Sequence, residues 1–149
     1  MATIYLAGAI GKVSKKRAEE WRKYFVTTYS YFVDRPDVIN PIDFFSYDEV
    51  EKYTEREVLD WELSEVSKSD VLVVNLDRVT ESVGTLQEMA TAYTHHIPII
   101  AFHLHMTEQE IKETLHSWIG TECTKIFTGS YAINKVADYV ATYYDRSNH

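Results

Sequence analysis

Short apolar runs alternate with stretches of helical periodicity along the whole chain. The runs cover residues 3–7, 38–40, 71–76, 99–102 and 125–127, and glycine, proline or polar residues bound each of them. Runs of this kind are typical of strands that are buried on both faces of a parallel sheet. We therefore predict five strands at these positions.

Between the strands, apolar residues recur at intervals of three and four, which predicts helices. The expected helices run from Ser14 to about Tyr31, Thr54 to Lys68, Thr85 to His95, Thr107 to Trp118 or Ile119, and Ser130 to Tyr144. We expect the aromatic-rich stretch 41–47 to be a loop. Strands that alternate with helices indicate right-handed crossovers. The predicted fold class is α/β, a single-domain flavodoxin-like or Rossmann-like three-layer sandwich over residues 1–149 with a five-stranded parallel sheet.

Composition narrows the range of partners. The 149 residues carry a net charge of −8, which argues against a nucleic-acid polymer because such binding depends on neutralising phosphates. No apolar run approaches the roughly 20 residues of a membrane span, so we expect no membrane association. The single cysteine, Cys123, excludes an internal disulfide framework and favours a reducing, cytoplasmic location. A small anionic ligand held by a local basic cluster is compatible with this composition.

Two predicted loops, residues 8–12 and 77–84, follow strands and face the same edge of such a sheet. The first loop matches neither the P-loop nor the dinucleotide-binding fingerprint. Its two glycines still allow a ligand close to the backbone, just before a helix N-terminus. Four cations fall within residues 12–17. They form either a solvated charged face or a local attraction for an anionic substrate.

Glu88 follows the carboxyl end of the central strand and is the best-placed carboxylate for chemistry. Its local pattern, Thr85-x-x-Glu88, also fits a helix capping box, and the same pattern recurs at residues 54–57 and 107–110. The structural alternative is therefore that Glu88 only caps a helix.

Two other acids complete the set of candidates. Glu62 can reach the same edge only if its helix crosses the strand ends, whereas Asp70 stands at the opposite end of the central strand and is interpreted as structural. Two carboxylates that flank an anomeric carbon are the usual apparatus for glycosidic cleavage.

Four histidines, His95, His96, His103 and His105, suggest a metal site at first sight. No cysteine lies near them and no carboxylate stands beside them at ligand spacing. We expect no metal and no cofactor.

Four motifs follow one another over nearly the whole chain. They are Tyr5-Leu6-Ala7-Gly8-Ala9-Ile10, Asn40-Pro41 with the aromatics after it, the segment 69–76, and the segment 82–93. In order and spacing they resemble the nucleoside 2-deoxyribosyltransferase family, which includes relatives that hydrolyse nucleoside 5′-monophosphates. The resemblance implies a retaining mechanism, with Glu88 as the nucleophile that forms a 2-deoxyribosyl ester and Tyr5 orienting its carboxylate. Glu62 takes the position of the family's acid on the base side, where the family has aspartate.

The substrate is expected to contact Gly8, Ala9, Ile10, Asn40, Asp43, Phe44, Phe45, Ser82, Gly84 and Thr85. Transferases of nucleosides usually carry an aspartate at the position of Ser82, whereas the monophosphate hydrolases use a serine toward the 5′-phosphate. Ser82 therefore favours a phosphorylated substrate, although the first loop lacks the serine- and glycine-rich run of those hydrolases. Transfer of the sugar to a second base, strict monophosphate hydrolysis and a non-catalytic nucleotide-binding module stay open, as does an NAD-type glycohydrolase.

Members of this family are oligomers in which a neighbouring subunit completes the site near the loop before the last strand. The resemblance places His116 and Ser117 there. We therefore expect a homo-oligomer in which these residues contribute to a neighbour's site. For the adjacent Trp118, an ordinary core position is the alternative.

Overall fold

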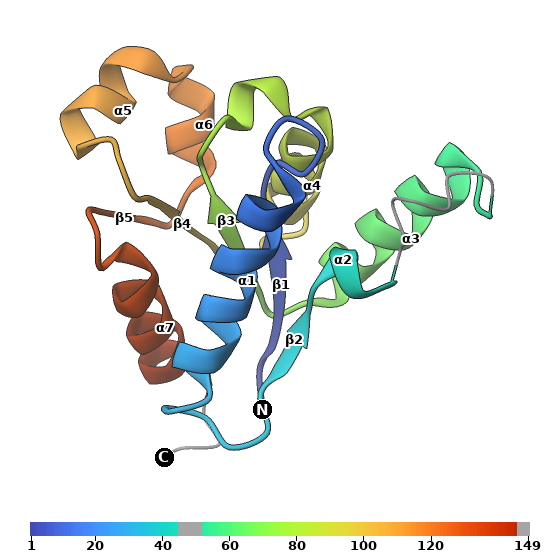
Figure 1. Cartoon of the computed structure of the whole chain (residues 1–149), viewed down its shortest axis with the longest axis horizontal. Helices are drawn as coiled ribbons and strands as arrows, with labels where there is room; N and C mark the ends of the chain where they lie inside the picture. Colours follow the sequence, from blue (N-terminus) through green and yellow to red (C-terminus); the bar gives the residue numbers. More distant parts are fainter. Residues whose placement is uncertain (45–51, 146–149) are drawn as a thin grey trace.

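Five strands form one parallel sheet in the part of the chain that the computed structural model describes, residues 1–44 and 52–145 (Figure 1). They are β1 (Thr3–Ala7), β2 (Asp37–Ile39), β3 (Val71–Asn75), β4 (Ile99–His103) and β5 (Lys125–Thr128). Their order in the sheet is β2-β1-β3-β4-β5, which is the flavodoxin-like order. The predicted fold class and all five predicted strands are confirmed, with shifts of one residue at some ends.

Helices cover both faces of the sheet. The helical segments are α1 (Lys15–Tyr29), α2 (Pro41–Phe44), α3 (Glu55–Lys68), the 3-10 turn η1 (Val79–Glu81), α4 (Val83–Thr94), α5 (Glu108–Thr114), α6 (Ser117–Glu122) and α7 (Ala132–Tyr143). One core lies between the sheet and the pair α1 and α7, and the other lies under α4, α5 and α6. In the described residues, no helix combines the length and the apolar character that a membrane crossing requires.

Local side-chain contacts set several helix starts. The Ser14 hydroxyl accepts a hydrogen bond from the Arg17 backbone N–H at 3.1 Å and so caps α1. Complete capping boxes open α3 at Thr54 and α5 at Thr107. These caps satisfy backbone donors that have no partner within the helix. Two of the three capping boxes expected from the sequence are therefore confirmed.

Two predicted boundaries are wrong. Residues 41–44 form the short helix α2 rather than a loop, and residues 45–47 of that predicted loop lie outside the described residues. The helix predicted from Thr107 to Trp118 or Ile119 is broken into α5 and α6, because Leu115 and His116 adopt extended backbone angles. The His116 ring then caps the new helix by accepting the Trp118 backbone N–H at 3.1 Å.

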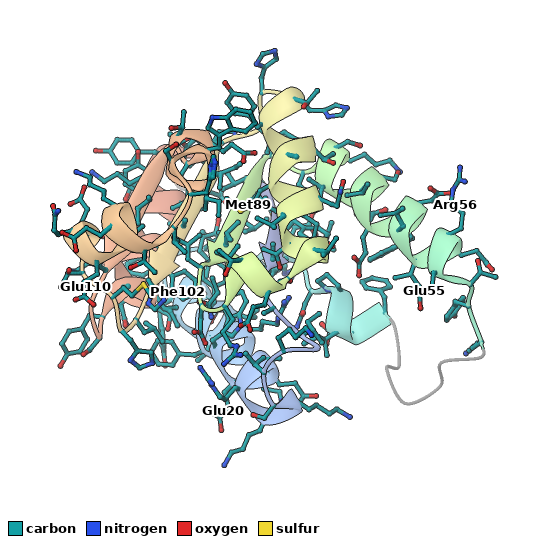
Figure 2. All side chains as sticks on the ribbon, turned by 90° about the horizontal axis from the view of Figure 1, so that it is seen from above. Glu20, Glu55, Arg56, Met89, Phe102 and Glu110 are labelled. Carbon is teal, nitrogen blue, oxygen red and sulfur yellow. The ribbon has the colours of Figure 1, made fainter. Side chains whose placement is uncertain are left out.

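Helix α3 extends away from the sheet, with Glu55 and Arg56 at its far end (Figures 1 and 2). Only Val66, near its carboxyl end, is fully buried, whereas Val58, Trp61 and Leu63 are half-buried. By contrast, Met89 of α4 is fully buried and lies over the sheet (Figure 2).

Candidate active site

A cleft of about 390 Å³ opens at the carboxyl ends of β1 and β3. In the order of the sheet, the chain reverses direction at this pair of strands, where open α/β sheets hold their ligands. The cleft is lined by Gly8, Ile10, Gly11, Lys12, Arg22, Pro41, Val58, Glu62, Glu81, Ser82, Val83, Gly84, Thr85 and Glu88. Both loops predicted to face this edge, residues 8–12 and 77–84, therefore contribute to one site.

Glu88 is not part of a capping box, so the structural alternative for this residue is wrong. Helix α4 begins at Val83, two residues earlier than predicted, and Ser82 is its N-cap. The Ser82 hydroxyl lies 2.7 Å from the Thr85 hydroxyl and accepts the Thr85 backbone N–H at 3.4 Å. This leaves Glu88 in the second turn, where its side chain is 5% exposed and lines the cleft.

The environment of Glu88 favours its protonated form. Burial is the main cause, and the charge of Glu62 adds to it, so that the pKa of Glu88 is raised from 4.5 to about 8. The Tyr5 hydroxyl and the Arg22 guanidinium act in the opposite direction on this pKa. A carboxyl group with such a pKa exchanges its proton near neutral pH, which is typical of functional sites.

Tyr5 brings a buried hydroxyl from β1 to this carboxyl group. Its side chain is fully buried, and burial followed by the charges of Glu88 and Glu62 raises the pKa of Tyr5. Among the described residues, the hydroxyl makes no hydrogen bond of ordinary length and angle. It still lies close enough to Glu88 for the O–H dipole to lower the pKa of that carboxyl. A buried donor without a full partner is costly, so its position calls for a functional reason.

Glu62 does reach the edge of the sheet where Glu88 lies, as its proposed role requires. Glu62 of α3 lines the cleft at the carboxyl edge of the sheet together with Glu88. Burial raises the pKa of Glu62, and the Arg22 guanidinium opposes this change. The cleft therefore holds two carboxyl groups whose protonation is coupled.

Arg22 is a residue of the cleft that the sequence analysis missed. It is 1% exposed, and its guanidinium carbon lies 4.7 Å from the centre of the Trp21 ring. The signal was present in the helical periodicity, because Arg22 stands four residues after Ala18 and three before Phe25 on the buried face of α1. A cation on an apolar helix face indicates a buried partner.

The other predicted substrate contacts divide into two groups. Gly8, Ile10, Ser82, Gly84 and Thr85 line the cleft. At Gly8, a Cβ atom would approach the Trp21 ring to 2.9 Å, so the close packing of β1 against α1 requires glycine here.

The remaining predicted contacts lie elsewhere. Ala9 faces a separate cleft between α1 and α7, and Asn40 and Asp43 line a neighbouring groove. The Phe44 ring packs against Trp61 at 4.6 Å between ring centres and is 58% exposed, while Phe45 lies outside the described residues.

The two residues predicted to serve a neighbouring subunit, His116 and Ser117, are exposed and do not line the cleft of their own chain. Trp118 is 73% exposed, so the core position considered for it is wrong. Whether His116 and Ser117 reach another subunit stays a prediction.

The basic cluster near the start of α1 is mostly engaged outside the cleft. Arg17 pairs with Asp77, and Lys16 lies 3.7 Å from Glu20, whereas Lys12 lines the cleft. At the far edge of the sheet, the Asp70 carboxylate accepts the Thr3 backbone N–H at 2.8 Å, in agreement with the structural role predicted for it. Within the described ranges, no three His, Cys, Asp or Glu side chains are placed to hold a metal ion.

Comparison of the chain with known protein families identifies the family to which it belongs. The family described as nucleoside 2-deoxyribosyltransferase like matches residues 1–106, a range that includes every residue of the cleft. The chain belongs to this family. Membership in the nucleoside 2-deoxyribosyltransferase-like family supports an enzyme of the deoxyribosyltransferase or N-glycosidase kind, and the predicted resemblance is confirmed.

Solved structures similar to this family member share its fold. A conserved protein from Enterococcus faecalis V583 is similar over 93% of this chain and 98% of that chain, with a TM-score of 0.72 and 16% identity. A CMP N-glycosidase from Clostridium botulinum gives a TM-score of 0.54 at 14% identity, over 92% of this chain and 97% of that chain. A 2-deoxyribosyltransferase from Bacillus psychrosaccharolyticus gives 0.53 at 19% identity, over 81% and 90% of the two chains. No curated protein matches the chain by sequence.

Proposed function

We propose that this protein cleaves the N-glycosidic bond of a 2′-deoxynucleoside or its 5′-monophosphate through a covalent 2-deoxyribosyl ester on Glu88. The observation that carries the proposal is the buried Glu88 carboxyl, which shares a cleft at the carboxyl edge of the sheet with a second carboxyl, Glu62. Family membership adds the substrate class. The structures named above as a CMP N-glycosidase and a 2-deoxyribosyltransferase have the same fold and are consistent with it.

The proposed reaction has two steps with an oxocarbenium-like transition state in each. In the first, a Glu88 oxygen forms a bond to C1′ while the C1′–N bond breaks, and Glu62 supplies the proton that the departing base requires. In the second, the nitrogen of another base or a water oxygen bonds to C1′ while the C1′–O bond of the Glu88 ester breaks and returns the carboxylate. Glu62 takes the proton that the attacking base or water loses and is restored to its starting state.

The buried hydroxyl of Tyr5 has a role in this scheme. Because it lies beside Glu88 without a hydrogen bond of ordinary geometry in the described residues, it is free to donate to the carboxylate once Glu88 ionises. Such a donor orients one carboxylate oxygen and leaves the other for C1′. Tyr5 is thus proposed as the residue that positions the nucleophile.

Incubation with the four deoxynucleosides and their 5′-monophosphates tests this function directly. Chromatography should detect free base from at least one of these substrates. Release without an added base identifies a hydrolase, whereas new nucleosides that form only with a second base identify a transferase. Stabilisation by a nucleotide with no product from any substrate, including NAD, would instead identify a binding module.

The position of Ser82 at the N-terminus of α4 bears on whether the substrate carries a phosphate. Aspartate and asparagine cap helices about as well as serine, so Ser82→Asp and Ser82→Asn should both fold. If a 5′-phosphate binds here, the added carboxylate should raise KM for monophosphates by roughly 10- to 100-fold relative to Ser82→Asn, and leave nucleosides unaffected. Steady-state kinetics of the two variants on both substrates measure this, and equal monophosphate KM values would remove Ser82 from the phosphate site.

We also propose that the active form is a homo-oligomer whose contact includes the exposed start of α6. Trp118, the second residue of α6, is a large apolar residue that is 73% exposed there. Trp118→Glu should lower the sedimentation coefficient to that of a monomer and reduce turnover. Tyr131→Glu is the matched control. The Tyr131 side chain is as exposed as that of Trp118, at 73%, but Tyr131 follows β5 in the chain whereas Trp118 precedes it. A wild-type protein that sediments as a fully active monomer would contradict the proposal.

A further inference from the structure

The buried guanidinium of Arg22 donates hydrogen bonds to several of the segments that surround the cleft. Nη1 of Arg22 donates hydrogen bonds to the Leu6 carbonyl at 2.8 Å and to the Asn40 side-chain oxygen at 3.1 Å. Nη2 donates to the Gly8 carbonyl at 3.1 Å. Leu6 and Gly8 stand at the end of β1 and the start of its loop, and Asn40 directly follows β2. Arg22 therefore fixes the floor of the cleft from α1.

The same guanidinium lines the cleft together with two acids, Glu62 and Glu88. The ionisable side chains that line the cleft or face its carboxyl groups come from β1, its loop, α1, α3, η1 and α4, and are Tyr5, Lys12, Arg22, Glu62, Glu81 and Glu88. Lys12 and Glu81 are exposed, so water screens their charges. Of this set, Arg22 is the buried cation, Glu88 is the buried acid and Glu62 is a half-buried acid.

The buried Glu88 and the half-buried Glu62 share one buried cation, and ionising both carboxyl groups is unfavourable because like charges in a poorly solvated site repel each other. With the cation present, the charge of one carboxylate is balanced, and the raised pKa of Glu88, about 8, favours a proton on that group. Without the cation, the pKa of both carboxyl groups would rise further. Burial raises the pKa of both Glu62 and Glu88, and the Arg22 guanidinium opposes this rise in each case, in agreement with this balance.

We propose that Arg22 is a positioning residue that keeps the Glu62–Glu88 pair singly protonated, so that one carboxylate is ionised while the other holds a proton. The consequence for catalysis rests on the proposed function, since the first step requires the one proton of the pair to pass from Glu88 to Glu62, which leaves the nucleophile ionised and the acid protonated. The charge balance itself does not depend on any activity.

Two variants separate the charge of Arg22 from its hydrogen bonds. Arg22→Gln removes the positive charge and keeps a hydrogen-bond donor. Arg22→Lys keeps the positive charge and loses the planar guanidinium group that donates to several acceptors at once. Arg17→Gln is the matched control, because Arg17 lies on the same helix but pairs with Asp77 outside the cleft. Carbon-13 NMR of glutamate-labelled protein reports the titration of each carboxyl carbon, with Glu88→Gln and Glu62→Gln used to assign the two signals.

The titration midpoint of Glu88 should rise by about one pH unit or more in Arg22→Gln, and stay within about half a unit of wild type in Arg22→Lys and Arg17→Gln. The acidic limb of the pH profile of kcat/KM should move in parallel in Arg22→Gln. Arg22→Lys should retain the wild-type profile even where its kcat is lower.

An unchanged Glu88 midpoint in Arg22→Gln would overturn the proposal, and so would a midpoint in Arg22→Lys that matches Arg22→Gln. Should Arg22→Gln fail to fold, Arg22→Lys decides alone, because a displacement above about one unit in a variant that keeps the charge contradicts the inference. If the titrations behave as expected but wild type releases no base from any substrate, the charge balance stands and the proposed reaction fails.

Discussion

Glu88→Gln is expected to lower turnover at least about a thousandfold on every substrate that the wild type accepts, because an amide oxygen is a poor nucleophile toward C1′. The substitution keeps the size of the side chain, so the effect should appear in kcat rather than in substrate binding. Initial rates of base release measure it. Glu88→Ala should be equally inactive, and small anions such as azide or formate should restore part of its turnover by entering the space that the side chain vacates.

Glu57→Gln provides the control for this experiment. Glu57 shows the same Thr-x-x-Glu pattern, but it is an exposed member of the capping box that opens α3. Because glutamine serves in a capping box as glutamate does, Glu57→Gln should retain full activity. Full activity of Glu88→Gln on all substrates would refute the assignment of the nucleophile.

The same substitution at Glu88 is expected to stabilise the fold at alkaline pH. The pKa of Glu88 is about 8 in the folded protein against 4.5 for an ordinary glutamate, so between these values the folded state holds a proton that the unfolded state has lost. Stability therefore falls as pH rises through this window, by at most about 5 kcal/mol in total. Glutamine does not titrate and escapes this loss.

Thermal unfolding of Glu88→Gln and wild type between pH 4 and pH 9 measures the difference. Tm should be at least about 5 °C higher for Glu88→Gln at pH 9, and the two curves should converge near pH 4, where both side chains are neutral. Glu57→Gln should follow wild type throughout, because Glu57 is exposed. A constant difference between Glu88→Gln and wild type at all pH values would show that packing, and not the charge of Glu88, is responsible.

Together these two results would describe a site in which the fold loses stability so that a buried group can react. Burial of a group that must ionise weakens the fold, and the same burial brings its proton exchange close to neutral pH. A protein selected for stability alone would carry an apolar or amide side chain at position 88.

Features that depend on neighbours in the chain were accessible from the sequence. The apolar runs predicted the strands, because a buried parallel strand needs little more than a short apolar segment and a turn. The capping boxes at Thr54 and Thr107 were correct, since their hydrogen bonds span three residues. The family motifs also lie along the sequence, and the match over residues 1–106 agrees with them.

Tertiary structure decided what the side chains of the cleft do. Glu88 has the same local pattern as Glu57 and Glu110, and only the start of α4 at Val83 and the approach of β1 and α3 separate it from them. The burial of Arg22 depends on the end of β1 and on Asn40, which lies 18 residues away. The sequence by itself determined the strands, the helix caps and the family. The proton equilibrium of the cleft was decided by the tertiary structure, because desolvation and charge coupling act through space between segments that are distant in the chain.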